Sequence, residues 1–332
     1  MSFLSHSFQK VVSLRSISWV RIAGWTFVLI FLLNLSVSPK EGTEINGVGA
    51  EESLSPQGQR KTNIFQSLVE VPLTPKPKQE YADPQPISAK SALVTDLKTG
   101  TILWEKEAHL SLPPASTTKM MTALVSLDSF SLEAAVTVPE ICSALPVDQS
   151  QMGLVAGERL SVENLLYGLL VQSASDAACT LSYHHPQGQE GFINEMNTKA
   201  ASLGMGDSIF ANPSGNDTND SSHLASAWDL NLAAKKVLDQ SVLRKIVGTQ
   251  EVNIPSLDQK YWHLLRNTNE LLFTYPGTVG VKTGFTGQAL GCLILAVERQ
   301  GHELLIVVLG SVDRFGEAQM LADWALGSYT WD

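Results

Sequence analysis

The 332-residue sequence predicts an α/β fold in which an antiparallel sheet is flanked by helices and interrupted by an inserted helical lobe. Short apolar runs bounded by turn residues occur near the start of the globular body and again near its end. A long stretch with helical periodicity lies between them. We therefore expect strands from the two ends of the body to pair into one sheet.

The first strands are expected at residues 91–95 and 101–104, which are apolar and separated by a turn sequence that ends at Gly100. A helix is expected after Pro113. A mostly helical region is expected from 162 to 243.

The end of the chain predicts three more strands, at residues 280–283, 292–297 and 304–309, because each is a short run rich in β-branched and apolar side chains. A last helix is expected from 316 to 326. Its core-facing side should include Leu321 and Trp324.

The composition excludes several classes of protein. Hydrophobic residues make up 44% of the chain and charged residues 17%, which argues against a mainly disordered chain. The net charge of -10 argues against nucleic acid as the main partner, because phosphate binding needs a basic face. The three cysteines, Cys142, Cys179 and Cys292, are odd in number and widely spaced. We therefore expect no disulfide framework and no metal site, only buried thiols.

The N-terminal segment, residues 1–40, is expected to be a membrane anchor or a signal segment. Three cations, Lys10, Arg15 and Arg21, precede an uncharged run at 22–39 that is just long enough to span a bilayer. The cations should stay in the cytoplasm, so the body would lie outside. An uncleaved anchor is favoured over a cleaved signal peptide, the alternative.

Residues 41–81 are expected to be a flexible linker, because they are polar and then proline-rich, with little to bury. The globular domain would then comprise residues 82–332.

The first motif is Ser116-Thr117-Thr118-Lys119. Positions three apart share a helix face, so the Lys119 amine should lie beside the Ser116 hydroxyl. A serine hydroxyl becomes a good nucleophile when a neighbouring base takes its proton, and a buried lysine can be that base. The same spacing occurs between Ser7 and Lys10, where we expect it to have no meaning.

The second motif is Ser173-Ala174-Ser175, at the point where an apolar helix is expected to end. A second serine there would be able to pass a proton to a leaving amine. A loop or helix cap is the alternative interpretation.

The third motif is Lys282-Thr283-Gly284. A lysine and a hydroxyl on one strand suit a carboxylate, and Gly284 leaves room for a peptide against the strand. A second copy of the triplet at residues 98–100 is interpreted as a plain hairpin turn.

The ordered set of these motifs resembles the class A β-lactamases and penicillin-binding proteins. The sequence around these motifs resembles that of the D-alanyl-D-alanine carboxypeptidases, the low-molecular-mass penicillin-binding proteins. The segments that carry this resemblance are residues 114–124, 210–215, 266–269 and 280–286. The resemblance implies a β-lactamase/transpeptidase-like fold and no cofactor.

The resemblance also implies a role for each residue. Ser116 would attack the bond between the last two D-alanines of a peptidoglycan stem peptide, and Lys119 would be the general base. Ser173 would relay a proton to the departing D-alanine. Lys282 and Thr283 would bind the terminal carboxylate. Backbone N–H groups of Ser116 and Phe285 would form the oxyanion hole, and β-lactam antibiotics would acylate Ser116.

One position departs from the family pattern, because Ser175 stands where the family usually has asparagine. A hydroxyl is shorter than an amide and has fewer hydrogen-bonding groups, so we expect an altered but working site. The alternatives are a non-catalytic or weakly active penicillin-binding wall protein, or a β-lactamase. The β-lactamase is disfavoured because no acidic residue stands where its deacylating base should be.

Further candidate residues have structural interpretations beside the functional ones. His184 and His185 are expected in a surface turn, not at a metal. Glu190 and Asn194 reproduce a β-lactamase spacing, but are expected to begin a helix. Arg314, before the last helix, is a candidate for assisting with the substrate carboxylate. Since the chain ends just after that helix, the N-terminal segment would be what holds the enzyme at the membrane.

Overall fold

We describe a computed structural model of the chain, in which residues 73–217 and 222–332 are described. The expected anchor, most of the expected linker and the Ser7–Lys10 spacing lie outside these ranges. Within them, no helix is long and apolar enough to cross a membrane.

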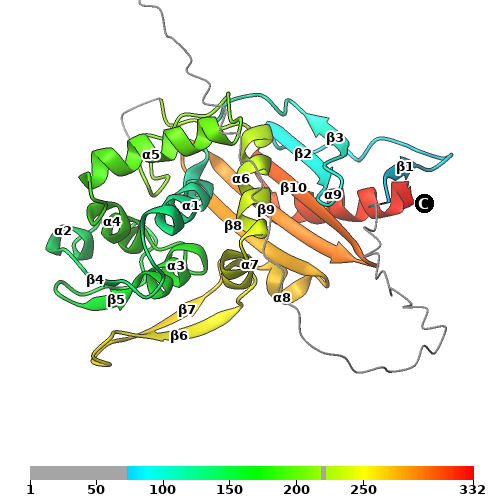
Figure 1. The fold of residues 1–332 in the computed structure, drawn as a ribbon. Helices are drawn as coiled ribbons and strands as arrows, with labels where there is room; N and C mark the ends of the chain where they lie inside the picture. Colours follow the sequence, from blue (N-terminus) through cyan, green and yellow to red (C-terminus); the bar gives the residue numbers. More distant parts are fainter. Residues whose placement is uncertain (1–72, 218–221) are drawn as a thin grey trace, which may run out of the picture. The chain divides into compact units, whose positions relative to one another are not determined.

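The central sheet has five strands in the order β3-β2-β10-β9-β8 (Figure 1). All neighbouring pairs are antiparallel. The strands are β2 (Ser91–Asp96), β3 (Ile102–Lys106), β8 (Thr278–Thr286), β9 (Leu290–Arg299) and β10 (His302–Ser311). Since Ala92 pairs with Val308, strands from the two ends of the body form one sheet, as predicted.

Strands β9 and β10 are apolar along nearly their whole length because both faces of the sheet are covered there. Along β10, Leu305 and Val307 contribute to the core beneath the helical lobe, whereas Ile306 and Val308 contribute to the core beneath the C-terminal helix α9 (Arg314–Ser328). Figure 1 shows α9 behind the sheet and the helical lobe beside it. This alternation follows from the period of two in a strand.

The helical lobe lies between β3 and β8 in sequence, as expected. Its helices are α1 (Lys119–Ser129), α2 (Glu140–Ser143), α3 (Val162–Leu170), α4 (Ser175–Tyr183), α5 (Gly188–Ser202), α6 (Ala227–Asp239) and α7 (Ser241–Val247). A short 3₁₀ helix, η1 (Ala115–Thr118), leads into α1. Serine side chains cap α3 and α6, where Ser161 and Ser226 accept N–H groups of the first turn.

Three two-stranded sheets were not predicted. They are β1 (Pro75–Pro77) with β11 (Tyr329–Trp331), β4 (Ala135–Thr137) with β5 (Arg159–Ser161), and β6 (Glu251–Pro255) with β7 (Trp262–Arg266). A short helix, α8 (Leu271–Thr274), follows β7. Because β1 pairs with β11, the folded body begins before residue 82, inside the range expected to be linker.

Several smaller expectations are confirmed. The triplet at residues 98–100 forms the turn between β2 and β3, where the Asp96 carboxylate accepts the Thr99 N–H at 2.8 Å. Glu190 and Asn194 lie in α5. Leu321 is fully buried on α9 and Trp324 is partly buried against the same core. The expectation of a surface position is confirmed for His184, which is exposed, and is wrong for His185, which is buried with its ring against Phe192 of α5.

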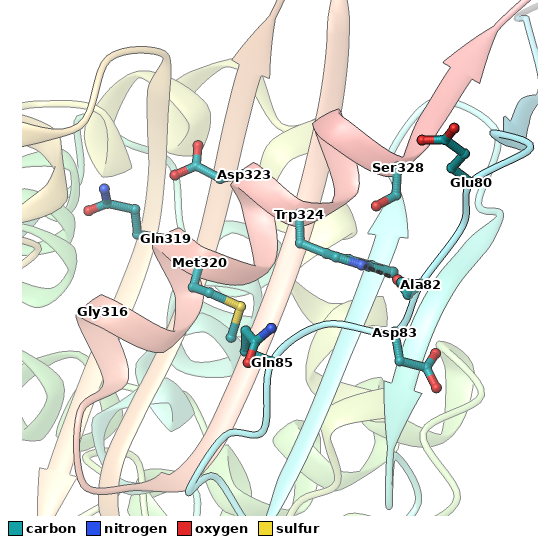
Figure 2. Close-up of a pocket in the computed structure, with 10 residues that line it drawn as sticks. All are labelled: Glu80, Ala82, Asp83, Gln85, Gly316, Gln319, Met320, Asp323, Trp324 and Ser328. Atoms are coloured by element: carbon teal, nitrogen blue, oxygen red, sulfur yellow. Dashed lines mark hydrogen bonds between the residues drawn. The ribbon is translucent and has the colours of Figure 1, made fainter.

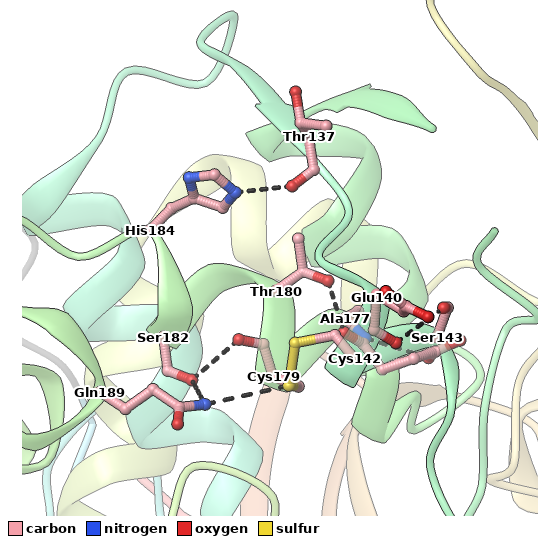
Figure 3. Close-up of a disulfide and its surroundings, with 11 residues drawn as sticks. Thr137, Glu140, Cys142, Ser143, Ala177, Cys179, Thr180, Ser182, His184 and Gln189 are labelled. Atoms are coloured by element: carbon pink, nitrogen blue, oxygen red, sulfur yellow. Dashed lines mark hydrogen bonds between the residues drawn. A yellow bond between two sulfur atoms is a disulfide. The ribbon is translucent and has the colours of Figure 1, made fainter. Parts of the chain in front are cut away.

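The cysteine prediction is wrong for two of the three residues. Cys142 of α2 and Cys179 of α4 form a disulfide, with their Cα atoms 5.5 Å apart (Figure 3). Only Cys292 of β9 is a free, buried thiol. The odd number of cysteines did not exclude a disulfide, because three cysteines can form one bridge and leave one free thiol.

Candidate active site

The serine and lysine of the first motif contact each other at the start of α1. Ser116 lies in η1 and is partly exposed, whereas Lys119 is completely buried. The Lys119 Nζ atom lies 3.0 Å from the Ser116 Oγ atom. This is within hydrogen-bonding distance for transfer of the hydroxyl proton.

Two other groups hold the Lys119 amine in place. It donates a hydrogen bond to the Ser214 carbonyl oxygen at 2.7 Å and lies 3.3 Å from the Ser175 Oγ atom. Burial lowers the pKa of Lys119 to about 7, although the nearby Asp176 carboxylate acts in the opposite direction. A substantial fraction of the amine is therefore neutral at neutral pH, as a general base must be.

The second motif lies in the turn between α3 and α4. Ser173 has a left-handed backbone (φ 61°) and is 5% exposed, and Ser175 begins α4. The structure brings Ser175 to Lys119 directly and places Ser173 two residues away in the same turn. The shorter serine side chain therefore keeps the contact with the amine that the sequence left in doubt.

A buried carboxylate fixes that turn. The Asp176 side chain accepts hydrogen bonds from the N–H groups of Met152, Gly153 and Leu154 at 3.0–3.1 Å. The Ser175 N–H also donates to the Ser150 carbonyl at 2.7 Å. Residues 150–154 are thus tied to the start of α4, where Ser175 lies.

The third motif lies on β8. Lys282 is buried and its amine donates to the Thr283 carbonyl at 3.0 Å. Burial, followed by repulsion from the Lys119 and Arg314 cations, lowers the pKa of Lys282 well below its ordinary value. The Thr283 hydroxyl lies 2.6 Å from that of Thr268. An anion at this position would relieve the electrostatic cost of gathering these cations.

Glycines let the backbone segments of the site approach closely. A Cβ atom at Gly284 would lie 3.0 Å from the Ser116 nitrogen and from the Ala115 Cβ atom. Gly215 has a positive φ of 78°, and a Cβ atom there would lie 1.8 Å from the Ala115 carbonyl oxygen. Strand β8 therefore passes directly beside the backbone of the serine.

The remaining predicted residues lie at the end of β8 and at the start of α9. Phe285 is 64% exposed. The Arg314 guanidinium carbon lies 5.8 Å from the Phe285 ring centroid, and its Nη1 atom donates to the Gly284 carbonyl at 3.4 Å. Arg314 therefore lies beside the third motif.

Three residues of the site were not assigned a role from the sequence: Asp176, Ser214 and Thr268. Ser214 and Thr268 lie in segments that carry the family resemblance. Their place in those segments could have marked them as residues of the site. Asp176 directly follows Ser175, but its partners at 152–154 are visible only in the fold.

A separate hollow of about 680 Å³ lies between α9 and the segment 80–85 (Figure 2). Its lining includes Glu80, Asp83, Met320 and Trp324. It contains none of the motif residues. Among the described residues, no cluster of three or more His, Cys, Asp or Glu side chains is arranged to hold a metal ion.

Comparison with known proteins gives a family match over most of the body. Residues 78–313 match the sequence model of peptidase family S11, D-alanyl-D-alanine carboxypeptidase. The chain belongs to this family.

Two curated members of the S11 family illustrate the similarity. The chain is 34% identical over 248 residues to the D-alanyl-D-alanine carboxypeptidase DacF of Bacillus subtilis. The matched region covers 73% of the chain and 63% of the relative. It is 33% identical over 242 residues to DacB2 of Mycobacterium tuberculosis, covering 71% of the chain and 81% of the relative. The chain thus spans less than two thirds of the length of DacF.

Solved structures confirm the S11 fold. A D-alanyl-D-alanine carboxypeptidase from Mycobacterium tuberculosis superposes with a TM-score of 0.70 at 31% identity, covering 76% of the chain and 96% of that structure. A Streptomyces DD-transpeptidase gives a TM-score of 0.70 at 30% identity, with 74% and 100% covered. The β-lactamase/transpeptidase-like architecture expected from the sequence is therefore correct.

Proposed function

We propose that the chain is a serine-type D-alanyl-D-alanine carboxypeptidase that removes the terminal D-alanine from peptidoglycan stem peptides. The observation that carries this proposal is the fully buried Lys119 amine, 3.0 Å from the Ser116 hydroxyl. A neutral amine at that distance activates a hydroxyl without histidine or metal.

In the first half of the reaction, Ser116 Oγ attacks the carbonyl carbon of the penultimate D-alanine while its proton passes to Lys119 Nζ. The negative charge on the substrate oxygen is stabilised by the backbone N–H groups of Ser116 and Phe285. The C–N bond then breaks as the departing amine takes up a proton by way of Ser173. In the second half, water attacks the ester, and Ser116 recovers its proton as the shortened peptide leaves.

The substrate carboxylate would bind at the end of β8. Lys282 and Thr283 supply a cation and a hydroxyl there, and Arg314 lies on the same side. Since burial, and then the nearby cations, lower the pKa of Lys282, an arriving carboxylate favours the charged amine and gains a strong interaction with it. This arrangement favours a C-terminal peptide over an uncharged amide.

Related reactions share the same acyl-enzyme. Relatives include D-alanyl-D-alanine endopeptidases of Pseudomonas aeruginosa and Escherichia coli and the DD-transpeptidase of Streptomyces. A weakly active penicillin-binding protein is the second candidate, since Ser175 replaces an asparagine. The 3.3 Å contact between Ser175 and Lys119 favours the active enzyme.

The decisive experiment combines fluorescent penicillin labelling with D-alanine release from a D-Ala-D-Ala peptide. The carboxypeptidase predicts stable labelling and release by the wild type, and neither by a Ser116→Ala variant. Labelling without release would indicate the weakly active protein. Rapid loss of the label would indicate a β-lactamase.

We also propose that the body works at the extracytoplasmic face of the bacterial cell membrane, held there by the N-terminal segment. The cation-preceded apolar run at 22–39 supports this location. The Cys142–Cys179 disulfide supports it independently, because such bonds persist in oxidising compartments. Fractionation of cells that express the full chain, followed by membrane washing with salt, tests it.

A further inference from the structure

The β6–β7 hairpin lies at the lower edge of the molecule in the view of Figure 1, and alternate residues of β7 are exposed. Along β7, Trp262 and Leu264 are 56% and 75% exposed, whereas the alternate residues His263 and Leu265 are buried. Exposed apolar side chains grouped in this way mark interaction surfaces more often than isolated ones do.

The inner face of the hairpin is firmly held, so the exposed side chains lie on a fixed platform. His263 contacts the Glu158 carboxylate at 2.7 Å and the Met152 carbonyl at 3.0 Å. The Pro255 carbonyl accepts a hydrogen bond from the Asn164 amide at 3.1 Å. A preformed surface binds its ligand without an ordering cost.

The exposed charged side chains of the hairpin include two ion pairs. Arg266 forms an ion pair with Glu251, and Lys260 pairs with Asp258 at 3.0 Å. An anionic lipid surface attracts unpaired cations, and the chain as a whole carries a net charge of -10. The face therefore suits an uncharged ligand that has both apolar and hydroxyl-bearing surfaces.

A hollow of about 570 Å³ lies at the base of the same hairpin. It is lined by Gly248, Gln250, Glu251, Arg266 and Phe273. The Arg266 guanidinium stacks 4.4 Å from the Phe273 ring centroid. Because the guanidinium covers that face of the ring, the hollow offers a sugar mainly polar partners, the Gln250 amide and the Arg266–Glu251 pair.

The hairpin is continuous with the candidate active site. The Arg266 N–H donates to the side chain of Gln172, the neighbour of Ser173, at 3.1 Å. Two residues further on, Thr268 contacts Thr283 of the third motif. From Trp262 to Arg266 the strand extends about 13 Å at its usual rise, the length of a short oligosaccharide.

We propose that the outer face of β6–β7 and the hollow at its base bind the uncharged glycan strand to which the stem peptide is attached. The proposal rests on the proposed function, because it extends the substrate of that site from the peptide to the polysaccharide. Trp262 and Leu264 contact the sugar ring faces, and the polar groups of the hollow bind hydroxyl and acetamido groups.

The test measures binding of the full chain to uncharged oligomers of β-1,4-linked N-acetylglucosamine, which carry the sugar rings and acetamido groups of the glycan strand without stem peptides or free carboxylates. Trp262→Ala and Leu264→Ser should each weaken binding about tenfold. Trp262→Tyr should retain it, because the aromatic face remains. Ile102→Ser, which removes a 41% exposed side chain from edge strand β3, is the matched control and should bind like the wild type.

A second measurement separates this proposal from the proposed function. All these variants should release D-alanine from a sugar-free peptide within twofold of the wild type, while Trp262→Ala should slow release from intact murein. If the wild type releases no D-alanine from the peptide, the proposed function fails, and the glycan-binding assay still tests the hairpin. Equal glycan binding by all variants would overturn the proposal. So would hairpin-dependent binding to phospholipid vesicles or hairpin-dependent dimerisation in its place.

Discussion

The hydroxyl of Ser175 lies 3.3 Å from the amine of Lys119, so a serine at this position reaches the amine that we propose as the general base. Ser175→Ala removes this contact. We expect kcat/KM to fall about 10- to 100-fold, since a hydrogen bond to an ionisable group contributes about 1.5–3 kcal/mol. Ser175→Asn should stay within threefold of the wild type. D-alanine release by the purified variants measures both, and full activity in Ser175→Ala would contradict the assigned contact.

The pH dependence of kcat/KM should follow the protonation state of the Lys119 amine. Because burial lowers the pKa of Lys119 to about 7, kcat/KM should rise with pH through a midpoint near 7 as the amine loses its proton. Lys119→Arg should be inactive at every pH by a factor of about 10³ or more, because a guanidinium does not deprotonate. A profile that stays flat from pH 5 to 9 would exclude Lys119 as the base.

The same burial has a consequence for stability. The folded state binds the Lys119 proton more weakly than the unfolded state, whose pKa is the ordinary 10.5. The contribution of Lys119 to the free energy of unfolding should therefore be least favourable below about pH 7. It should become more favourable as the pH rises from about 7 to 10.5. Lys119→Met should lose this component, and urea unfolding at pH 6, 8 and 10 compares the two proteins.

Asp176 should influence both the fold and the pH profile. Its carboxylate raises the pKa of Lys119, so Asp176→Asn should move the acidic limb of the profile to lower pH. The variant should also unfold at lower temperature, because N–H groups of residues 152–154 lose an acceptor. Asp148→Asn changes an exposed carboxylate near the same segment and should alter neither property.

The disulfide should be detectable by counting thiols. The denatured, non-reduced protein should react with one equivalent of a thiol reagent, at Cys292. A double Cys142→Ser, Cys179→Ser variant should lose about 2–4 kcal/mol of unfolding free energy, because the bridge closes a long loop. Cys292→Ser should show no reactive thiol and keep the bridge. Three reactive thiols in the wild type would refute the pairing.

Gly284 should be sensitive to the smallest substitution. In Gly284→Ala, the new Cβ atom would press on the backbone nitrogen of Ser116, and a displacement near 1 Å costs about 10²-fold in rate. Penicillin acylation and D-alanine release should slow together. Gly287→Ala is the matched control on the same segment, since its Cβ atom would meet nothing within 4 Å. Equal rates in the two variants would show that the close approach is unimportant.

The elements predicted correctly are those that a local pattern determines. The apolar runs of β9 and β10 are long and bounded by turns, and the Ser116–Lys119 contact follows from the spacing along one helix start. The hairpin β6–β7 was missed although Val252 and Ile254 alternate with polar residues, because each strand has only five residues.

The features that sequence could not supply depend on contacts between distant segments. Asp176 gains its role from N–H groups at 152–154, and Cys142 meets Cys179 only because α2 packs against α4. The Ser175–Lys119 distance depends on the positions of two separate helices. Neither composition nor periodicity contains this information.

The pairing of β2 with β10 has a consequence for biosynthesis. Ala92 meets Val308 across more than two hundred intervening residues, so the sheet cannot close until nearly the whole polypeptide has been made. Ser116 and strand β8 both lie within that interval of the sequence. A nascent or prematurely terminated chain that lacks β10 therefore cannot join β2 and β3 to β9 and β8, and its central sheet stays in two parts.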